Sequence, residues 1–178
     1  MADTVQQLID KQQLLELSLE YCRAIDRRDF ARLRSLYHDD AIDDHGGMFR
    51  GTADEYVAWV PQMLAMFEAT VHCLANALYV VEADHAQGEL YTTAYHRTPG
   101  PEGREIVIGG RYLDRYERRR GTWKYAHRSL AMDWCRVKPT DVQAYRELAA
   151  SAPAGRADHE DPSYFALSFF RRGAKVKS

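Results

Sequence analysis

Residues 69–89 read ATVHCLANALYVVEADHAQGE, and this stretch decides the fold class. Its first part is rich in β-branched and aromatic residues, which favour strands. The polar run EADHAQG interrupts this strand-favouring composition, and residues that favour a strand follow it. A short connection between two strands makes them antiparallel neighbours. The stretch therefore predicts a hairpin of two long strands.

The sequence on both sides of this hairpin extends the pattern. Downstream, the connections TPGPEG and RRRG separate further strand-like runs, so we expect strands at 70–82, 87–97, 104–118 and 122–136. Upstream, the apolar residues recur with a helical period. There we expect a helix over 4–28, a second helix capped by Asp29, a short strand around 41–43, and a third helix opened by a Thr52–Glu55 capping box and interrupted or restarted at Pro61.

Helices followed by strands indicate an α+β fold whose sheet wraps the helices on one face. Beyond Pro139 the sequence offers a short helix, TDVQAYRELAA, and then a tail rich in proline, glycine and aspartate. The tail stretch DPSYFALSFF holds too many aromatic residues for a free chain end. We expect a main domain over 1–137 and a C-terminal helix and tail over 138–178 that pack on that domain or on a neighbouring subunit.

The composition narrows the range of partners. The chain has 178 residues, is 46% hydrophobic and 28% charged, and carries a formal net charge of −2, which argues against a nucleic acid or an anionic membrane as partner. It shows no signal-peptide pattern and no run long enough to span a bilayer. Cys22, Cys73 and Cys135 are widely spaced and odd in number, which suits a reduced, cytoplasmic protein. No metal-ligand motif occurs, so we expect neither a metal nor another cofactor.

Two strands place polar residues in apolar rows. On the last strand Arg128 is the only charge on a face that it shares with Leu130, while Tyr125 falls on the opposite face. A buried guanidinium requires an anionic partner or a ligand. On the strand at 70–82, His72 and Asn76 are the polar members of one apolar row, and the other row is equally apolar. Either row can face the core, and the remaining row can face a neighbouring subunit.

The first helix presents a similar anomaly at its end. Leu15, Leu19, Cys22 and Asp26 lie on one helical face, and Asp26 falls in the last turn, where the helix dipole disfavours a carboxylate. A carboxylate beside an imidazole fixes the tautomer of the ring and stabilises the imidazolium. Asp26 can therefore serve His72 as part of a catalytic pair. It can equally be a solvated cap or the ion-pair partner of Arg128.

Other candidate positions carry the same ambiguity. Aromatic and methionine side chains such as Phe67, Met132 and Trp134 are core residues or line a ligand cavity. The acidic run DDAIDDH reads as a solvated turn that includes His45, although Asp43 can line the mouth of a cavity. The residues alone leave these readings open.

Three stretches of the chain resemble the SnoaL-like branch of the nuclear transport factor 2 superfamily: YCRAIDRRDFARLRSLYHDDA, ATVHCLANALYVVEADHAQGE and IGGRYLDRYERRRGTWKYAHRSLAM. The resemblance implies a cone, in which a strongly curved, mainly antiparallel mixed sheet and the N-terminal helices enclose an apolar cavity. Within the superfamily the chain is most similar to hexachlorocyclohexane dehydrochlorinase, and then to bile-acid 7α-dehydratase and scytalone dehydratase.

The resemblance also implies site residues. The Asp–His pair of the dehydrochlorinase falls on Asp26 and His72, and its active-site arginine falls on Arg128. The catalytic tyrosine of the bile-acid enzyme falls on Tyr21, where the dehydrochlorinase has a lysine, and this favours an oxygen-bearing substrate over dehalogenation. We expect these four residues to be catalytic, and we expect the substrate to touch Asp43, Met63, Phe67, Asn76, Ile108, Tyr112, Met132 and Trp134.

Three functions are compatible with this resemblance. The first is a cofactor-independent lyase, a dehydratase or a related isomerase, that abstracts a proton from a small hydrophobic substrate of aromatic, polyketide or steroid type. The second is a non-catalytic binder of small molecules, and the third is an assembly subunit with the same fold. The four polar residues together favour the lyase, because a scaffold has no use for a buried acid–base set. We further expect a homotrimer or a homodimer formed through the apolar outer face of the sheet.

Overall fold

The computed structural model describes residues 4–173 and has helices followed by strands, as expected. The helices are α1 (Val5–Asp26), α2 (Phe30–Ser35), α3 (Ala53–Leu64), α4 (Val142–Ala149) and α5 (Ser163–Ala166). The strands are β1 (Tyr37–Asp44), β2 (Arg50–Thr52), β3 (Ala69–Glu82), β4 (His85–Arg97), β5 (Arg104–Arg119) and β6 (Thr122–Pro139). The four long strands predicted from the sequence are confirmed.

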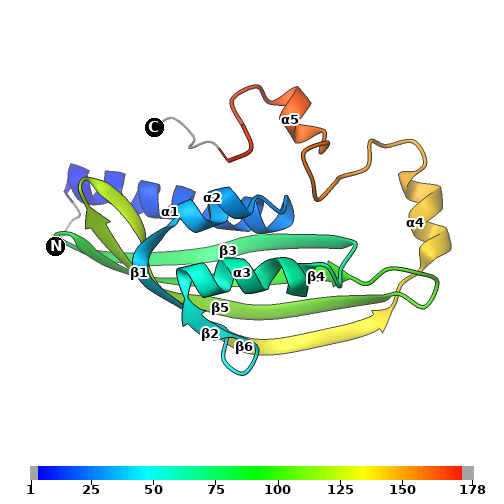
Figure 1. Ribbon diagram of the computed structural model, residues 1–178, viewed down its shortest axis with the longest axis horizontal. Coiled ribbons are helices and arrows are strands. Elements are labelled where there is room, and N and C mark those ends of the chain that lie inside the picture. The colour runs from blue at the N-terminus through cyan, green and yellow to red at the C-terminus, as the bar shows by residue number, and fades with distance from the viewer. Residues whose placement is uncertain (1–3, 174–178) are drawn as a thin grey trace.

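The strands form one mixed sheet in the order β2-β1-β6-β5-β4-β3 (Figure 1). β3 to β6 are an antiparallel meander, because each follows the last through a short connection. β1 lies parallel to β6, and β2 pairs antiparallel with β1. The chain therefore has the predicted α+β architecture.

The helices begin where the sequence places their caps. Thr4 and Thr52 each form a capping box, and the Asp29 carboxylate accepts a hydrogen bond from the backbone N–H of Arg32 at 3.1 Å. α3 continues through Pro61, so the expected interruption there is wrong. Pro61 lies in the last turns of this helix, where a lost hydrogen bond affects little of its length. No helix of the described residues is long and apolar enough to cross a membrane.

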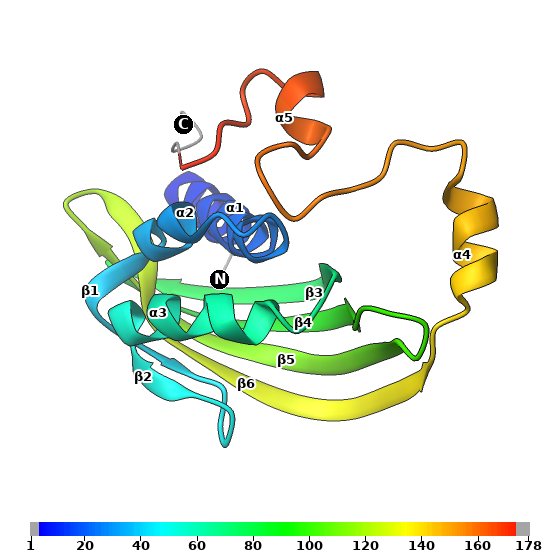
Figure 2. The same cartoon turned by 45° about the vertical axis from the view of Figure 1, so that its right-hand side comes forward.

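The three N-terminal helices lie over one face of the sheet, which we call the inner face (Figure 2). α1 packs on β3 and β6, and its buried side chains include Leu14, Leu17 and Ile25. The core also holds several fully enclosed tyrosines contributed by α1, α3, β1, β5 and β6. These hydroxyl groups bring polar atoms into the core, and they determine the chemistry of the region around α1.

The sheet bends beneath the helices but is not strongly curled, unlike the cone expected from the resemblance. β4 pairs with β5 without any break in register from His85 to Arg97. Bulges and glycine kinks introduce curvature into a sheet. The breaks in register lie in the β3–β4 and β5–β6 pairings, beside Thr92 and at Gly109 and Gly110, and the β4–β5 pairing between them is continuous.

Bulges in two other strands overturn the expected faces. The register of β3 shifts between Leu74 and Ala77, so that His72 lies on the inner face while Leu78 and Val80 are exposed. The register of β6 shifts opposite Arg115 and Tyr116, and as a result Tyr125 and Arg128 are both buried. The strict two-residue alternation that we assumed fails at each bulge, because one extra residue moves the following side chains to the other face.

Candidate functional site

Asp26 and His72 meet where α1 ends beside β3. The Asp26 carboxylate accepts two hydrogen bonds from the same residue, one from the backbone N–H of His72 at 2.9 Å and one at 2.7 Å involving the ring Nδ1. The side chains are 11% and 9% exposed, respectively. A carboxylate held at both oxygens fixes the orientation of the ring. With Nδ1–H donated to Asp26, the Nε2 atom of His72 carries the lone pair.

A second histidine lies beside this pair and was missed by the sequence analysis. The rings of His72 and His96 meet edge to face with centroids 5.5 Å apart, and Phe67 lies 4.7 Å from His96 on the other side. Burial, and next the proximity of His72, lower the pKa of His96 to about 4. His96 is therefore neutral at pH 7. Its position on β4, opposite Thr70 of β3, becomes evident only when the strand register is known.

Arg128 is completely buried, and its partner is Asp114 instead of Asp26. Nε and Nη2 of Arg128 donate to the two oxygens of Asp114 at 2.9 and 2.7 Å. The guanidinium carbon lies 3.9 Å from the ring centre of Tyr21 and 4.0 Å from that of Tyr112. The suggestion of an Asp26–Arg128 ion pair is thus wrong. Asp114 lies opposite Arg128 in the β5–β6 ladder, a pairing that the sequence signals only through its hairpin register.

Tyr21 belongs to a buried polar cluster next to Arg128. Its hydroxyl oxygen is 2.6 Å from the hydroxyl of Tyr56 on α3. Burial raises the pKa of the Tyr21 phenol well above its usual value, and Tyr56, Tyr112 and Asp43 add to this effect. Tyr21 is therefore a neutral phenol, able to donate a hydrogen bond but poorly able to lose its proton.

Asp43 lies in the same region and is fully buried, which corrects the interpretation of DDAIDDH as a solvated turn. The hydroxyl of Tyr37 donates to one oxygen of Asp43 at 2.6 Å, and Nδ1 of His45 lies 2.6 Å from the other. The ring of His45 stacks on Tyr56 with centroids 5.5 Å apart. A second carboxylate–imidazole pair thus ties the β1–β2 hairpin to α3.

The remaining expected substrate contacts fall into two groups. Met63, Phe67 and Ile108 are half-buried, and Tyr112 is buried beside Arg128. Asn76, Met132 and Trp134 are exposed, so the structure does not gather them with the buried residues. Asn76 lies where the register of β3 shifts, and β6 has another register shift between Met132 and Trp134. These breaks interrupt the alternation at Asn76 and before Trp134, whereas Met132 precedes the break in β6 and is exposed without one.

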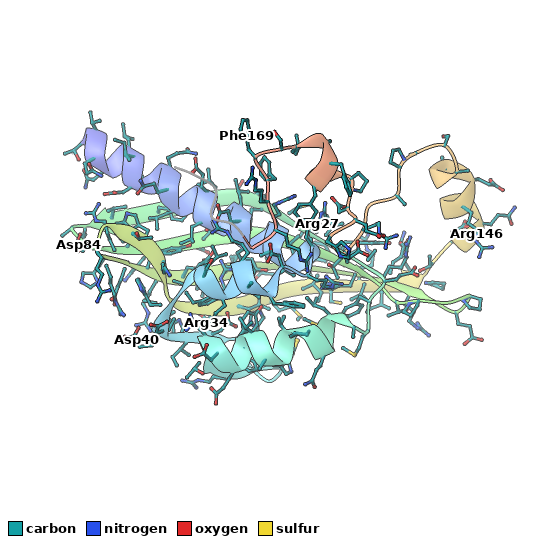
Figure 3. All side chains as sticks on the ribbon, turned by 45° about the horizontal axis from the view of Figure 1, so that its top comes forward. Arg27, Arg34, Asp40, Asp84, Arg146 and Phe169 are labelled. Carbon is teal, nitrogen blue, oxygen red and sulfur yellow. The ribbon has the colours of Figure 1, made fainter. Side chains whose placement is uncertain are left out.

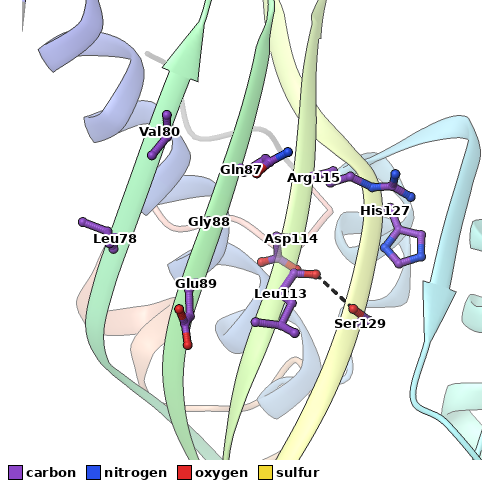
Figure 4. A pocket seen from close by; sticks show the side chains of 10 residues that line it. All are labelled: Leu78, Val80, Gln87, Gly88, Glu89, Leu113, Asp114, Arg115, His127 and Ser129. Carbon is purple, nitrogen blue, oxygen red and sulfur yellow. Dashed lines mark hydrogen bonds between the residues drawn. The ribbon is translucent and has the colours of Figure 1, made fainter.

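The outer face of the sheet carries a shallow apolar groove of about 430 Å³ (Figure 4). Leu78, Val80 and Leu113 form its apolar part, and Arg115 and His127 lie at one end. The sheet separates this groove from the Asp26–His72 pair, which lies on the inner face. The groove is therefore a surface feature with no part in the chemistry of that pair.

The model of the SnoaL-like domain matches residues 6–129. The chain belongs to the SnoaL-like domain family. Among curated proteins, an uncharacterized protein of Mycobacterium tuberculosis and its counterpart in Mycobacterium bovis are each 25% identical over 127 residues, which is 70% of this chain and 86% of theirs.

Solved structures share the SnoaL-like fold. A putative scytalone dehydratase from Novosphingobium aromaticivorans is 21% identical, with a TM-score of 0.66 over 73% of this chain and 88% of its own. A hexachlorocyclohexane dehydrochlorinase from Novosphingobium barchaimii is 23% identical, with a TM-score of 0.65 over 76% of this chain and 93% of its own. At these identities the likeness establishes the fold and leaves the activity open.

The Asp26–His72 pair has the geometry of a proton-transfer pair. Among residues 4–173, no three or more histidine, cysteine or acidic side chains are grouped so as to hold a metal ion. An imidazole with one nitrogen held by a carboxylate is suited to act as a general base. The neutral tyrosines and the Arg128–Asp114 pair lie in a separate enclosed cluster. The Asp26–His72 pair is less enclosed than this cluster, with side chains that are 11% and 9% exposed.

Proposed function

We propose that the chain is a cofactor-independent lyase, a dehydratase or a related isomerase, in which His72 abstracts a proton from a carbon next to an activating group. The geometry of the Asp26–His72 pair carries this proposal, because both carboxylate oxygens are committed to His72, at 2.9 and 2.7 Å. Such an arrangement leaves Nε2 as the base and stabilises the imidazolium that forms. A positioned base of this kind typically contributes about 10²–10⁴-fold to the rate.

The same imidazole also supplies the proton that the leaving group needs. Tyr21 is fully enclosed and its raised pKa makes it a poor acid. The imidazolium of His72 is therefore the better donor to a departing hydroxyl, which leaves as water, while the carbon–carbon double bond forms. In an isomerase, the same imidazolium returns the proton to a different carbon.

Tyr21 and Arg128 support the reaction from beside the site. Arg128 is held by Asp114 and three tyrosine rings, so it cannot touch a substrate unless this cluster rearranges. Its positive charge and the neutral Tyr21 hydroxyl still favour negative charge that develops nearby, such as that of an enolate. Asp114 reduces the size of this effect, because it offsets the charge of Arg128.

The proposed substrate is small, hydrophobic and oxygen-bearing, of aromatic, polyketide or steroid type. We expect it to bind on the inner face of the sheet at His72, on the side of the half-buried Met63, Phe67 and Ile108. The protein works as a homotrimer or homodimer in the cytoplasm. Its cysteines, one buried and two exposed, form no disulfide with one another, and a reducing compartment would keep them as thiols.

Hydrogen exchange into candidate substrates tests this function. Hydroxylated steroids, polyketides and lignin-type aromatics are incubated with the protein in deuterated buffer, and deuterium at carbon is measured by mass spectrometry. The wild type should label or dehydrate at least one class, and His72→Ala and Asp26→Asn should each nearly abolish that reaction with an unchanged circular dichroism spectrum. The exposed His85 supplies the matched control His85→Ala. Wild-type rates in His72→Ala would refute the proposal.

The same experiment separates the other two functions. A non-catalytic binder would bind one of these compounds without labelling it, and His72→Ala and Asp26→Asn would bind it as the wild type does. An assembly subunit would neither label nor retain the compounds and would co-purify with a larger partner. Either result would replace the lyase proposal.

A further inference from the structure

The C-terminal tail returns to the catalytic end of α1. After α4 the chain crosses back over the helices, and α5 lies above the C-terminal part of α1 (Figures 1 and 3). Residues 156–173 form this contact, and we call them the strap. They lie outside the residues matched by the SnoaL-like domain model, which ends at 129. The strap lies on the turn that follows Asp26, outside the part of the chain that identifies the family.

The turn that follows Asp26 carries an unfavourable charge and an unusual backbone conformation. Asp26 ends α1, where unpaired carbonyl groups and the helix dipole disfavour a negative charge. Arg28, two residues later, has a left-handed backbone with φ of 53°, which is unusual for a residue with a side chain. Its guanidinium turns inward and donates to the Thr70 hydroxyl of β3 at 2.8 Å. The turn thus ties α1 to β3 two residues before His72.

The strap supplies cationic and hydrogen-bonding groups to this turn from outside. Arg172 donates to the backbone carbonyls of Arg27 and Arg28 at 2.8 and 2.5 Å. The backbone N–H of Gly173 donates to Asp29 at 2.6 Å. The strap therefore holds the three residues that directly follow Asp26. The charge of Arg172 also opposes the negative end of the helix dipole.

A second anchor fixes the strap itself. Asp161 is 2% exposed and forms an ion pair with Arg27 at 3.1 Å. Burial alone would raise the pKa of Asp161, but hydrogen bonds from Arg156 and Ser163, together with Arg27, lower it to about 2. On α1, the guanidinium of Arg23 lies 5.1 Å from the ring centre of Tyr164 and 4.9 Å from that of Phe170. The strap is thus attached to the end of α1 and to the turn by an ion pair, by hydrogen bonds and by cation–π contacts.

We propose that Arg172 and Asp161 are positioning residues, through which the strap fixes the turn after Asp26 and so holds the Asp26–His72 hydrogen bond. Neither residue touches the substrate. Both act through the turn, by keeping the carboxylate of Asp26 aligned with Nδ1 of His72. This proposal rests on the proposed function, because positioning matters only if the pair is catalytic.

The tautomer of His72 tests the strap without any substrate. Nitrogen-15 NMR of the full chain distinguishes the Nδ1–H from the Nε2–H form of a neutral imidazole. The wild type should show the Nδ1–H form of His72 as the single neutral tautomer. Arg172→Ala and Asp161→Asn should each show a mixture of both tautomers. Arg172→Lys keeps the charge but loses the planar guanidinium, so its fraction of the Nδ1–H tautomer should lie between those of the wild type and Arg172→Ala.

Arg171→Ala is the matched control, because Arg171 is the exposed neighbour of Arg172 in the strap. It should leave the spectrum of the wild type unchanged. A pure Nδ1–H tautomer in Arg172→Ala and Asp161→Asn would overturn the strap proposal and leave the lyase proposal intact. A wild type that lacks the Nδ1–H tautomer would instead remove the basis of both.

Kinetics with a substrate found by deuterium labelling gives a second readout. A misaligned base should lower kcat by about tenfold in Arg172→Ala and leave KM near the wild-type value, because small displacements of reacting groups reduce rate more than binding. A purely structural strap would lower the amount of folded protein and leave kcat per folded molecule unchanged. That result would also overturn the proposal.

Discussion

At the scale of single residues, the buried charges determine how the protein responds to mutation and to pH. Arg128 and Asp114 are both enclosed and are bonded at two points. Removal of one partner leaves the other charge buried and uncompensated, which typically costs about 3–5 kcal/mol. We expect Asp114→Leu to lose stability of this order in urea unfolding.

The double variant Asp114→Leu with Arg128→Met provides the control for this prediction. It removes both charges, so it should be more stable than Asp114→Leu alone. A double variant at least as unstable as the sum of the two single variants would show that the pair is not the source of the loss. The tyrosine rings around Arg128 would then account for it.

His96 should make the fold sensitive to acid. Its pKa is lowered by burial, and next by His72, to about 4, against an unfolded value near 6.5. Above pH 6.5 both states are neutral, so the contribution is constant. As the pH falls from 6.5 to 4, the unfolded state takes up a proton that the folded state does not, and stability is lost.

Urea unfolding at pH 7 and pH 5 measures this effect. Between pH 7 and pH 5, the free energy of unfolding of the wild type should fall by about 2 kcal/mol more than that of His96→Gln. The full shift of the His96 pKa on folding corresponds to about 3 kcal/mol, and most of it takes effect between these two pH values. His85→Gln changes an exposed histidine of the same strand and should keep the acid sensitivity of the wild type. Equal losses in wild type and His96→Gln would contradict the assignment.

At the scale of elements, a hydrogen bond between two tyrosines joins α1 to α3. The hydroxyls of Tyr21 and Tyr56 are 2.6 Å apart and both side chains are enclosed. Tyr56→Phe leaves the Tyr21 hydroxyl without its partner, which should cost about 1–3 kcal/mol in thermal or urea unfolding. Tyr21→Phe combined with Tyr56→Phe removes both hydroxyls and should recover part of that loss. No recovery would mean that the loss of stability comes from other contacts of the Tyr56 hydroxyl, and not from the unpaired Tyr21 hydroxyl.

The elements also show what the sequence can and cannot predict. Caps, connections and strand texture are local, so Thr52, Asp29 and the four long strands were placed correctly. A bulge depends on how two strands pair, and for this reason the faces after Leu74 and around Tyr125 were wrong. The pairing of Asp26 with His72 came from a resemblance combined with two local anomalies. Asp114 and His96 gave no local signal, because only the register brings them to Arg128 and His72.

At the scale of the whole molecule, the outer face of the sheet carries an exposed apolar patch among polar side chains such as Gln87, Glu89 and Arg115. Leu78 is 69% exposed and Val80 57%, and Leu113 lies beside them in the outer groove (Figure 4). Because of the bulge in β3, Leu78 and Val80 point outward, whereas Tyr79 and Val81 are buried on the inner face. Exposed apolar patches of this kind mark interaction surfaces.

We therefore predict that the chain forms a homotrimer or homodimer through this outer face. Light scattering at micromolar concentration should give a mass above that of the monomer. Val80→Lys should shift the protein toward monomer, because it places a charge in the buried part of the interface, which such interfaces avoid. Leu148→Lys, on α4 and 82% exposed, is a matched control of equal charge and should keep the assembly. A monodisperse wild-type monomer would refute the prediction. If Val80→Lys is monomeric and still labels substrate, the Asp26–His72 site is complete within one subunit, as its position on the inner face implies.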